Sequence, residues 1–169
     1  KDKGELEAAI DSYKQALKIL PNYFEAYSNM GVVLKDSGLL EAAIDCYQRV
    51  LKIRPNYAEA YHNMGIALTE KGDLETAMES YKRAINIEPK HADAHINKAF
   101  LHLRLLDFEA GWLSNEWRWK VSKDRPQFLK TSKPLWKPFM KQRVLLWGEQ
   151  GLGDEIMFAS LILDMHSLS

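Results

Sequence analysis

A period of 34 residues constrains this chain more than any other feature of its sequence. Pro21, Pro55 and Pro89 are separated by 34 positions each. The segment EAYSNMGVVL at 25–34 returns as EAYHNMGIAL at 59–68. Three further residue types recur at the same step: Gly4, Gly38 and Gly72; Ala9, Ala43 and Ala77; and Tyr13, Tyr47 and Tyr81. Such a period predicts one supersecondary unit that is stacked repeatedly around a continuous core.

Each period is predicted to hold two helices. In residues 24–37 the apolar side chains lie three, four and seven positions apart, which places them on one helical face. Gly38 can take a positive φ and end this helix, and Pro55 cannot continue the second helix, predicted at 40–53. The predicted inward faces are Tyr27, Met30, Gly31 and Leu34, then Ala43, Tyr47 and Val50. The small residues among them would let the two helices cross closely.

Each unit carries, in order, an aromatic position, a large apolar position, two small positions, a tyrosine and a proline. This order resembles the tetratricopeptide repeat family. In two successive units these positions are Tyr27, Met30, Gly31, Ala43, Tyr47 and Pro55, then Tyr61, Met64, Gly65, Ala77, Tyr81 and Pro89. The resemblance implies an all-α solenoid of helical hairpins, a right-handed superhelix, whose first helices line a concave peptide-binding wall. We expect repeats over residues 1–119, divided into 1–23, 24–57, 58–91 and 92–119.

The two ends of this array depart from the pattern. Residues 1–23 correspond to the second half of a unit, so we expect a fragment with further repeats upstream. In the last unit the signature positions change, and three tryptophans follow. The changed positions are Lys98, Ala99, Leu106, Gly111 and Asn115, and the tryptophans are Trp112, Trp117 and Trp119. We therefore interpret 92–119 as a degenerate capping repeat whose tryptophans contact something other than another repeat.

The face of the first helices opposite the core predicts the binding groove. Stacking aligns acidic, asparagine and apolar positions: Glu25, Glu59 and Asp93; Asn29, Asn63 and Asn97; and Val32, Ile66 and Phe100. Asparagines here resemble the asparagine ladder of O-linked N-acetylglucosamine transferases, which holds peptides, but they equally suit bonds to neighbouring helices. The apolar row indicates a contact site or burial against the adjacent repeat. The acidic row argues against the carboxylate clamp of chaperone-binding repeats and favours an extended, partly basic peptide.

Other classes of site find little support in the sequence. Histidines at 62, 91, 95, 102 and 166 lack metal-ligand spacing with a supporting cluster, so we expect no metal or cofactor in this chain. Cys46, the one cysteine, aligns with Ser12 and Ser80, which predicts an unreactive thiol. It also fits a reducing, cytoplasmic location. Lys plus Arg equals Asp plus Glu at 23 each, and no apolar run approaches a membrane span.

Residues 120–142 are predicted to form a basic linker. Three prolines argue against helix, and seven basic residues accompany three aromatic ones. This composition suits stacking on nucleic acid bases or an extended strap packed on neighbouring domains. Because no repeat face adds to the positive charge, we favour the strap and expect no nucleic acid partner.

Residues 143–169 are predicted to begin a second domain. A short apolar strand at 143–147, the turn GEQGLGDEI and a helix form the first β-α unit of a parallel sheet, here truncated. The strand would pair with another molecule, which predicts dimerisation, rest on the repeats, or be disordered without the rest of its sheet. The glycine order matches neither a dinucleotide fingerprint nor a P-loop, and three carboxylates oppose a phosphate.

The segments GWLSNEWRW, PLWKP and LLWGEQGLGDEIMFA together resemble bacterial proteins that fuse tetratricopeptide repeats to a glycosyltransferase domain. The GLGDEI turn is similar to the first loop of the lipopolysaccharide heptosyltransferases, a GT-B family of two Rossmann-like domains. That resemblance implies a nucleotide-sugar donor for the parent protein. It also implies that Asp154 is the general base for the acceptor hydroxyl. Alternatively, Asp154 only caps its helix.

These observations predict a module that binds peptides or proteins and presents them to a glycosyltransferase domain largely outside this chain. The chain itself is expected to have no catalytic activity. The alternative is a non-catalytic interaction scaffold, in which the C-terminal segment belongs to a sheet without an active site.

Overall fold

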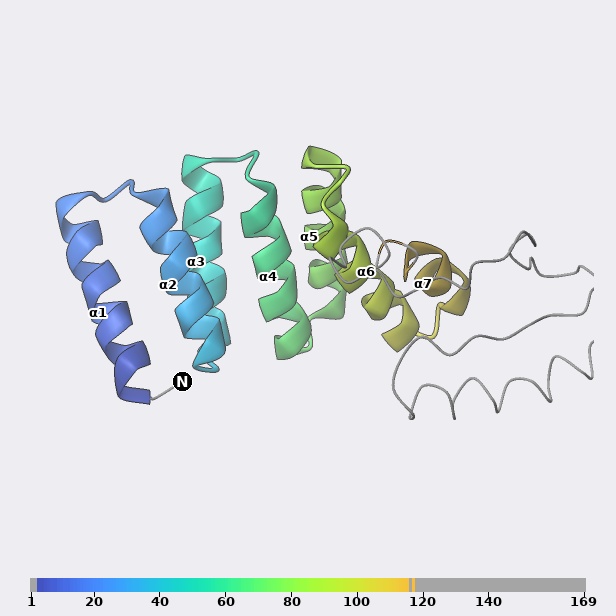
Figure 1. The fold of residues 1–169 in the computed structure, drawn as a ribbon, viewed down its shortest axis with the longest axis horizontal. Coiled ribbons are helices and arrows are strands. Elements are labelled where there is room, and N and C mark those ends of the chain that lie inside the picture. The colour runs from blue at the N-terminus through green and yellow to red at the C-terminus, as the bar shows by residue number, and fades with distance from the viewer. Residues whose placement is uncertain (1–2, 116, 118–169) are drawn as a thin grey trace, which may run out of the picture. The chain divides into compact units, whose positions relative to one another are not determined.

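The computed structural model describes residues 3–115 and residue 117, whose regular secondary structure is entirely α-helical. Figure 1 shows these helices succeeding one another as antiparallel hairpins. Their bounds are α1 (Lys3–Ile19), α2 (Phe24–Asp36), α3 (Leu40–Ile53), α4 (Ala58–Lys71), α5 (Leu74–Ile87), α6 (Ala92–Arg104) and α7 (Phe108–Asn115). The helices expected at 24–37 and 40–53 are confirmed, the first ending one residue early. The linker at 120–142 and the β-α unit at 143–169 lie outside the described residues.

The hairpins α2–α3, α4–α5 and α6–α7 form three successive units, which we call units two, three and four. Helix α1 packs on α2 and takes the place of a second helix in a preceding unit. The expected inward faces are buried: Met30 and Leu34 of α2, and Val50 of α3, join the core. The largest fully buried side chains include Tyr47 and Tyr81, one from each regular unit.

A glycine–tyrosine contact holds each regular hairpin together. A Cβ atom added to Gly31 would lie 2.6 Å from Cε1 of Tyr47, and one added to Gly65 would lie 2.6 Å from Cε1 of Tyr81. Real Cβ atoms do not approach another carbon that closely, so each tyrosine ring packs directly on the backbone of the facing helix. The 34-residue spacing of these pairs is therefore a packing requirement.

The turns within the regular units require glycine. Gly38 and Gly72 have φ values of 76° and 94°, a region that side chains other than glycine avoid. The next residue closes the helix end, since Leu39 N donates to Leu34 O at 2.9 Å and Asp73 N donates to Leu68 O at 3.0 Å. The expected helix ends are confirmed at both turns.

Unit four reaches the same hairpin with different residues. Leu106 holds the turn position with φ 63°, and Asp107 N donates to His102 O at 2.9 Å. A Cβ atom on Gly111 would lie 2.5 Å from Cδ2 of Leu103, so the close approach has moved to a new pair. Ala99 and Asn115 are buried where the glycine and tyrosine of the other units stand. The side chain of Leu103 supplies volume that the tyrosine ring supplies elsewhere.

The ring of Trp117 stacks on His95 of α6, with centroids 3.8 Å apart and planes 3° from parallel. This tryptophan therefore contacts its own unit, whereas Trp112 is 41% exposed. Trp119 lies outside the described residues. Within the described ranges, every helix is too short or too polar to cross a membrane.

Candidate functional site: the face of the first helices

The first helices of the three units, α2, α4 and α6, carry the residues that the sequence predicts for a groove. All three acidic positions, Glu25, Glu59 and Asp93, are exposed. Asn29 is exposed, whereas Asn63 and Asn97 are half-buried. The structure thus leaves the asparagine of unit two exposed to solvent and partly covers those of units three and four.

A groove of about 420 Å³ opens between α4 and α6. It is lined by Ile66, Thr69 and Glu70 from α4, Tyr81 from α5, and Asn97, Phe100, Leu101 and Arg104 from α6. Three of the nine predicted groove residues, Ile66, Asn97 and Phe100, lie in this lining. Sequence reasoning missed Thr69 and Tyr81, since their contribution depends on how the units stack.

The asparagines make contacts within the chain. Nδ2 of Asn97 lies 2.9 Å from Nε2 of His62 across the junction between α6 and α4. Nδ2 of Asn63 donates to Oε1 of Glu59 on the same helix at 3.4 Å. Asn97 therefore bonds to a neighbouring helix, which is one of the two roles that the sequence left open for this position. It remains at the edge of the groove.

The apolar row changes its exposure along the array. Val32 and Ile66 are half-buried, and Ile66 packs against the core. Phe100 is 55% exposed although it is a large aromatic residue. The groove therefore offers an open aromatic ring beside a more recessed aliphatic side chain.

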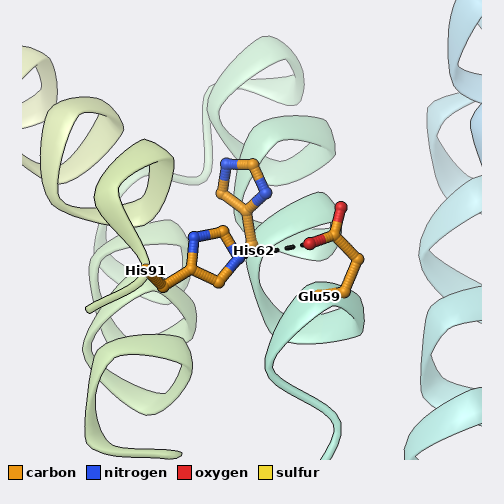
Figure 2. A group of neighbouring side chains, drawn as sticks. All are labelled: Glu59, His62 and His91. Carbon is orange, nitrogen blue, oxygen red and sulfur yellow. Dashed lines mark hydrogen bonds and ion pairs between the residues drawn. The ribbon is translucent and has the colours of Figure 1, made fainter. Parts of the chain in front are cut away.

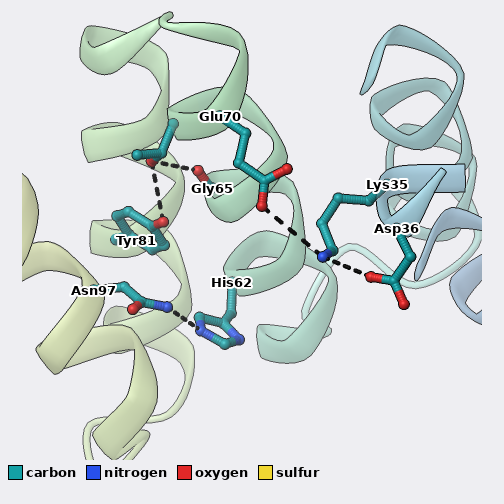
Figure 3. A network of polar contacts seen from close by, with 8 residues as sticks. Lys35, Asp36, His62, Gly65, Glu70, Tyr81 and Asn97 are labelled. Atoms are coloured by element: carbon teal, nitrogen blue, oxygen red, sulfur yellow. Dashed lines mark hydrogen bonds and ion pairs between the residues drawn. The ribbon is translucent and has the colours of Figure 1, made fainter. Parts of the chain in front are cut away.

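The polar contacts of this face link one unit to the next (Figure 3). Nζ of Lys35 lies 2.8 Å from Oδ1 of Asp36 and 3.9 Å from Oε1 of Glu70, which joins α2 to α4. One repeat later Thr69 replaces this lysine. Its hydroxyl donates to Gly65 O at 2.8 Å and lies 3.1 Å from the hydroxyl of Tyr81. A small residue thus stands in the groove where a lysine bridges the preceding junction.

A second group of side chains lies beside the groove (Figure 2). One potential ligand atom from each of Glu59, His62 and His91 lies within 4.8 Å of the others. Nε2 of His91 is 3.2 Å from Oε2 of Glu59, and the two imidazole rings are 4.7 Å apart. Burial, and next the neighbouring His91, lower the pKa of His62 below its ordinary value.

The sequence did not predict this group. Glu59 and His62 are three residues apart on one helix, which was the available signal. His91 lies 29 positions further along, at the start of α6, and only the stacking of units brings it near. The spacing of the histidines along the sequence therefore does not indicate a set of metal ligands.

Two candidate positions remain, Cys46 and Asp154. Cys46 is buried, and burial followed by Asp45 raises the pKa of its thiol to about 11, in keeping with the expected unreactive role. Asp154, the candidate base, lies outside the described residues.

Comparisons with known proteins agree with this architecture. Residues 1–38 match a family described as TPR repeat, and residues 22–90 match a family described as tetratricopeptide repeat. No curated protein has a sequence that matches this chain. Among solved structures 210 chains are similar, so the likeness identifies an architecture that many proteins share.

Three similar structures are of MamA. One crystal structure is 26% identical with a TM-score of 0.65, over 71% of this chain and 70% of that chain. A second, of MamA protein, is 26% identical with a TM-score of 0.63, over 70% and 65% of the two chains. MamA 41-end from Desulfovibrio magneticus RS-1 is 25% identical with a TM-score of 0.60, over 70% and 65%. In the latter two cases this chain spans less than two thirds of the other.

The family matches cover residues 1–90 between them, and the structure extends the same hairpin to unit four. The glycine–tyrosine contacts and the glycine turns form each regular hairpin, and the stacking of one hairpin per 34 residues explains the period. This chain is a tetratricopeptide repeat protein, and hence a protein–protein interaction module.

Proposed function

We propose that this chain is an interaction scaffold whose groove between α4 and α6 binds an extended peptide with apolar and positively charged side chains. The observation that carries the proposal is the groove of about 420 Å³, which combines an exposed phenylalanine with polar groups at its edge. Concave sites with an apolar lining and a few directed polar groups are where proteins most often bind ligands.

The apolar part of the ligand is assigned to Phe100 and Ile66. A phenylalanine that is 55% exposed beside a recessed isoleucine presents apolar surface that remains in contact with water in the free protein. Covering it with a leucine- or phenylalanine-sized side chain would contribute about 1.5–3 kcal/mol for the buried group. Aromatic anchors of this kind often dominate interface energetics.

The charge of the ligand follows from the first-helix face. Acidic residues outnumber basic ones there, with Lys35 and Arg104 the basic members, and Lys35 already contacts two carboxylates. Nη1 of Arg104 donates to Thr69 O at 3.4 Å. The acidic positions are Glu25, Asp36, Glu59, Glu70 and Asp93. A lysine or arginine in the ligand would be attracted to this face, and a carboxylate would be repelled.

Peptide-array binding followed by fluorescence anisotropy tests the proposal. We expect peptides with alternating apolar and basic residues to bind, and Phe100→Ala to weaken binding about 10-fold or more. Leu113→Ala is the matched control, because Leu113 is an exposed apolar residue on α7 and does not line the groove. A preference for acidic C-terminal peptides, or equal binding by the Phe100→Ala variant, would overturn it.

A second function is proposed on sequence grounds: the repeats present their partner to a glycosyltransferase domain that begins at residue 143. Its support is the GLGDEI segment and its resemblance to the heptosyltransferases. In a longer protein that carries such a domain, Asp154 would accept the proton of the acceptor hydroxyl, and the donor would be a nucleotide sugar. Asp154→Asn in that protein should abolish transfer while leaving peptide binding intact. Full transferase activity of this variant would show that Asp154 is not the general base.

A further inference from the structure

We propose that Glu59, His62 and His91 form a binding site for a divalent transition-metal ion of the Zn²⁺ class, which links unit three to unit four. Figure 2 shows the three side chains next to one another, with the contact between His91 and Glu59 dashed. Glu59 and His62 come from the first turns of α4, and His91 immediately precedes α6. This inference concerns a site beside the groove and does not depend on the proposed peptide ligand.

The donor set matches the chemistry of zinc. Two imidazole nitrogens and one carboxylate oxygen are a common set of three protein ligands, which leaves a fourth position open. Around a tetrahedral ion with bonds of about 2 Å, ligand atoms lie roughly 3.3–3.5 Å apart. The present atoms lie within 4.8 Å of one another, and Glu59 is 50% exposed on its side chain, so this carboxylate has room to close the remaining distance.

His62 carries the observation that points to a ligand. This residue is 7% exposed, and its Nδ1 has no hydrogen-bond partner among the described residues. A buried polar nitrogen without a partner is unfavourable unless another group satisfies it. Nε2 of the same ring is held by Asn97 at 2.9 Å, so Nδ1 is the nitrogen left to bind an ion.

The surrounding amides are placed to orient the ligands. With its amide turned so that the oxygen faces Nε2, Asn97 would accept a hydrogen bond from Nε2–H of His62, which leaves the Nδ1 lone pair for the ion. Asn63 donates to Oε1 of Glu59 and leaves Oε2 directed toward His91. Outer partners of this type are typical of metal-binding histidines and carboxylates.

His91 has two roles in the metal-free protein. Its Nδ1 accepts from Ala94 N at 3.3 Å as the N-cap of α6, and its Nε2 therefore donates to Glu59. Binding through Nε2 would move the ring proton to Nδ1 and break this long capping bond. Tyr23 and Tyr57 precede α2 and α4 without any side-chain capping bond, so the fold does not depend on that contact.

The repeat provides its own control residues. One unit earlier the same three positions are Glu25, Ser28 and Tyr57, which keep the carboxylate and lack both imidazoles. Ser28 is buried like His62, so serine is compatible with this position in the fold. His62→Ser and His91→Tyr therefore give unit three the residues that the preceding unit has at these positions.

The test is calorimetric titration of the full chain with ZnCl₂, with visible absorption of added CoCl₂ as a second probe. We expect one ion per chain, a Tm that rises with zinc, and about 100-fold weaker binding in His62→Ser and in His91→Tyr. Asn97→Ala should weaken binding about 10-fold, as outer partners do. His102→Ala should bind as the original chain does, since His102 contacts Asp107 elsewhere.

Circular dichroism establishes whether each variant is folded. If either histidine variant fails to fold, Glu59→Gln decides, because this exposed position tolerates an uncharged isostere and should bind zinc about 10-fold more weakly. No zinc-dependent heat or change in Tm in the original chain would overturn the proposal. The proposal would also be overturned by unchanged zinc affinity in both histidine variants when they are folded. If a histidine variant does not fold, unchanged zinc affinity in Glu59→Gln would overturn it.

Discussion

The regular hairpins of units two and three and the last hairpin, α6–α7, form the same structure from different residues. In the regular units a tyrosine packs on a glycine of the facing helix, and a second glycine with positive φ makes the turn. In unit four the close approach is between Leu103 and Gly111, and a leucine occupies the turn at φ 63°. The two arrangements exchange which helix provides the bulky side chain and which provides the glycine.

This difference shows that the hairpin requires a filled interface and does not require particular residues. Ala99 and Asn115 replace a glycine and a tyrosine, and both are buried. The side chain of Leu103, on the first helix of the hairpin, fills the space that the tyrosine ring of the second helix fills in the other units. Oδ1 of Asn115 is buried without a hydrogen-bond partner among the described residues, and Leu106 has a strained backbone. We therefore expect unit four to be the less stable of the two kinds of hairpin.

The largest effect should come from removing the central ring of a regular hairpin. Tyr81→Ala is expected to lower the free energy of unfolding by about 3–5 kcal/mol, because it leaves a cavity in a well-packed interface. Asn115→Ala at the same position of unit four should change it by about 1 kcal/mol or less, since its oxygen is already unpaired. Urea denaturation followed by circular dichroism measures both. Equal losses would mean that the two hairpins are packed alike.

A smaller loss is expected from filling the close approach. Gly65→Ala places a methyl group 2.6 Å from the Tyr81 ring, and overpacking of this kind costs about 1–3 kcal/mol. Part of this loss is offset by the better helix propensity of alanine, which is about 1 kcal/mol. In the Tyr81→Ala background the same change should be neutral or stabilising. A double-mutant cycle without such coupling would refute the proposed contact.

Relieving the strained turn should stabilise unit four slightly. Leu106→Gly is expected to raise the free energy of unfolding by about 0.5–1 kcal/mol, because glycine adopts a positive φ without penalty. Little burial is lost, since Leu106 is 73% exposed. The opposite change in unit three, Gly72→Ala, should lower stability by about 1 kcal/mol. Thermal and urea unfolding of the two variants should move in opposite directions.

The smallest effect on stability should come from a substitution in the groove. Phe100→Ala is expected to lower the free energy of unfolding by about 1 kcal/mol or less, because more than half of this ring is already exposed. A much larger loss in urea unfolding would show that Phe100 is a core residue and would remove the reason to assign it to a ligand.

Much of the fold could be predicted because it depends on local sequence. Gly38 and Gly72 mark the turns by a property of glycine alone, and helix α3 was expected at the bounds found. The contact between Leu103 and Gly111 could not be predicted, because it depends on which side chain enters a gap left by another residue. In unit four the signature positions indicated only that the pattern had changed.

The candidate site was less predictable than the fold. Helical spacing placed Asn97 and Phe100 on the first-helix face, and both line the groove. Spacing could not show that Asn97 bonds to His62, or that Lys35 bridges α2 and α4. These contacts join residues about one repeat apart, so their geometry depends on how successive units stack.

The most direct test of the account is to observe where a peptide binds. Amide chemical shifts of the labelled chain can be followed by NMR during titration with the tightest apolar and basic peptide from the array. The account predicts that the largest changes lie on α4 and α6, at Ile66, Thr69, Asn97, Phe100 and Leu101. Changes confined to α1 or α7, or no changes at saturating peptide, would contradict it.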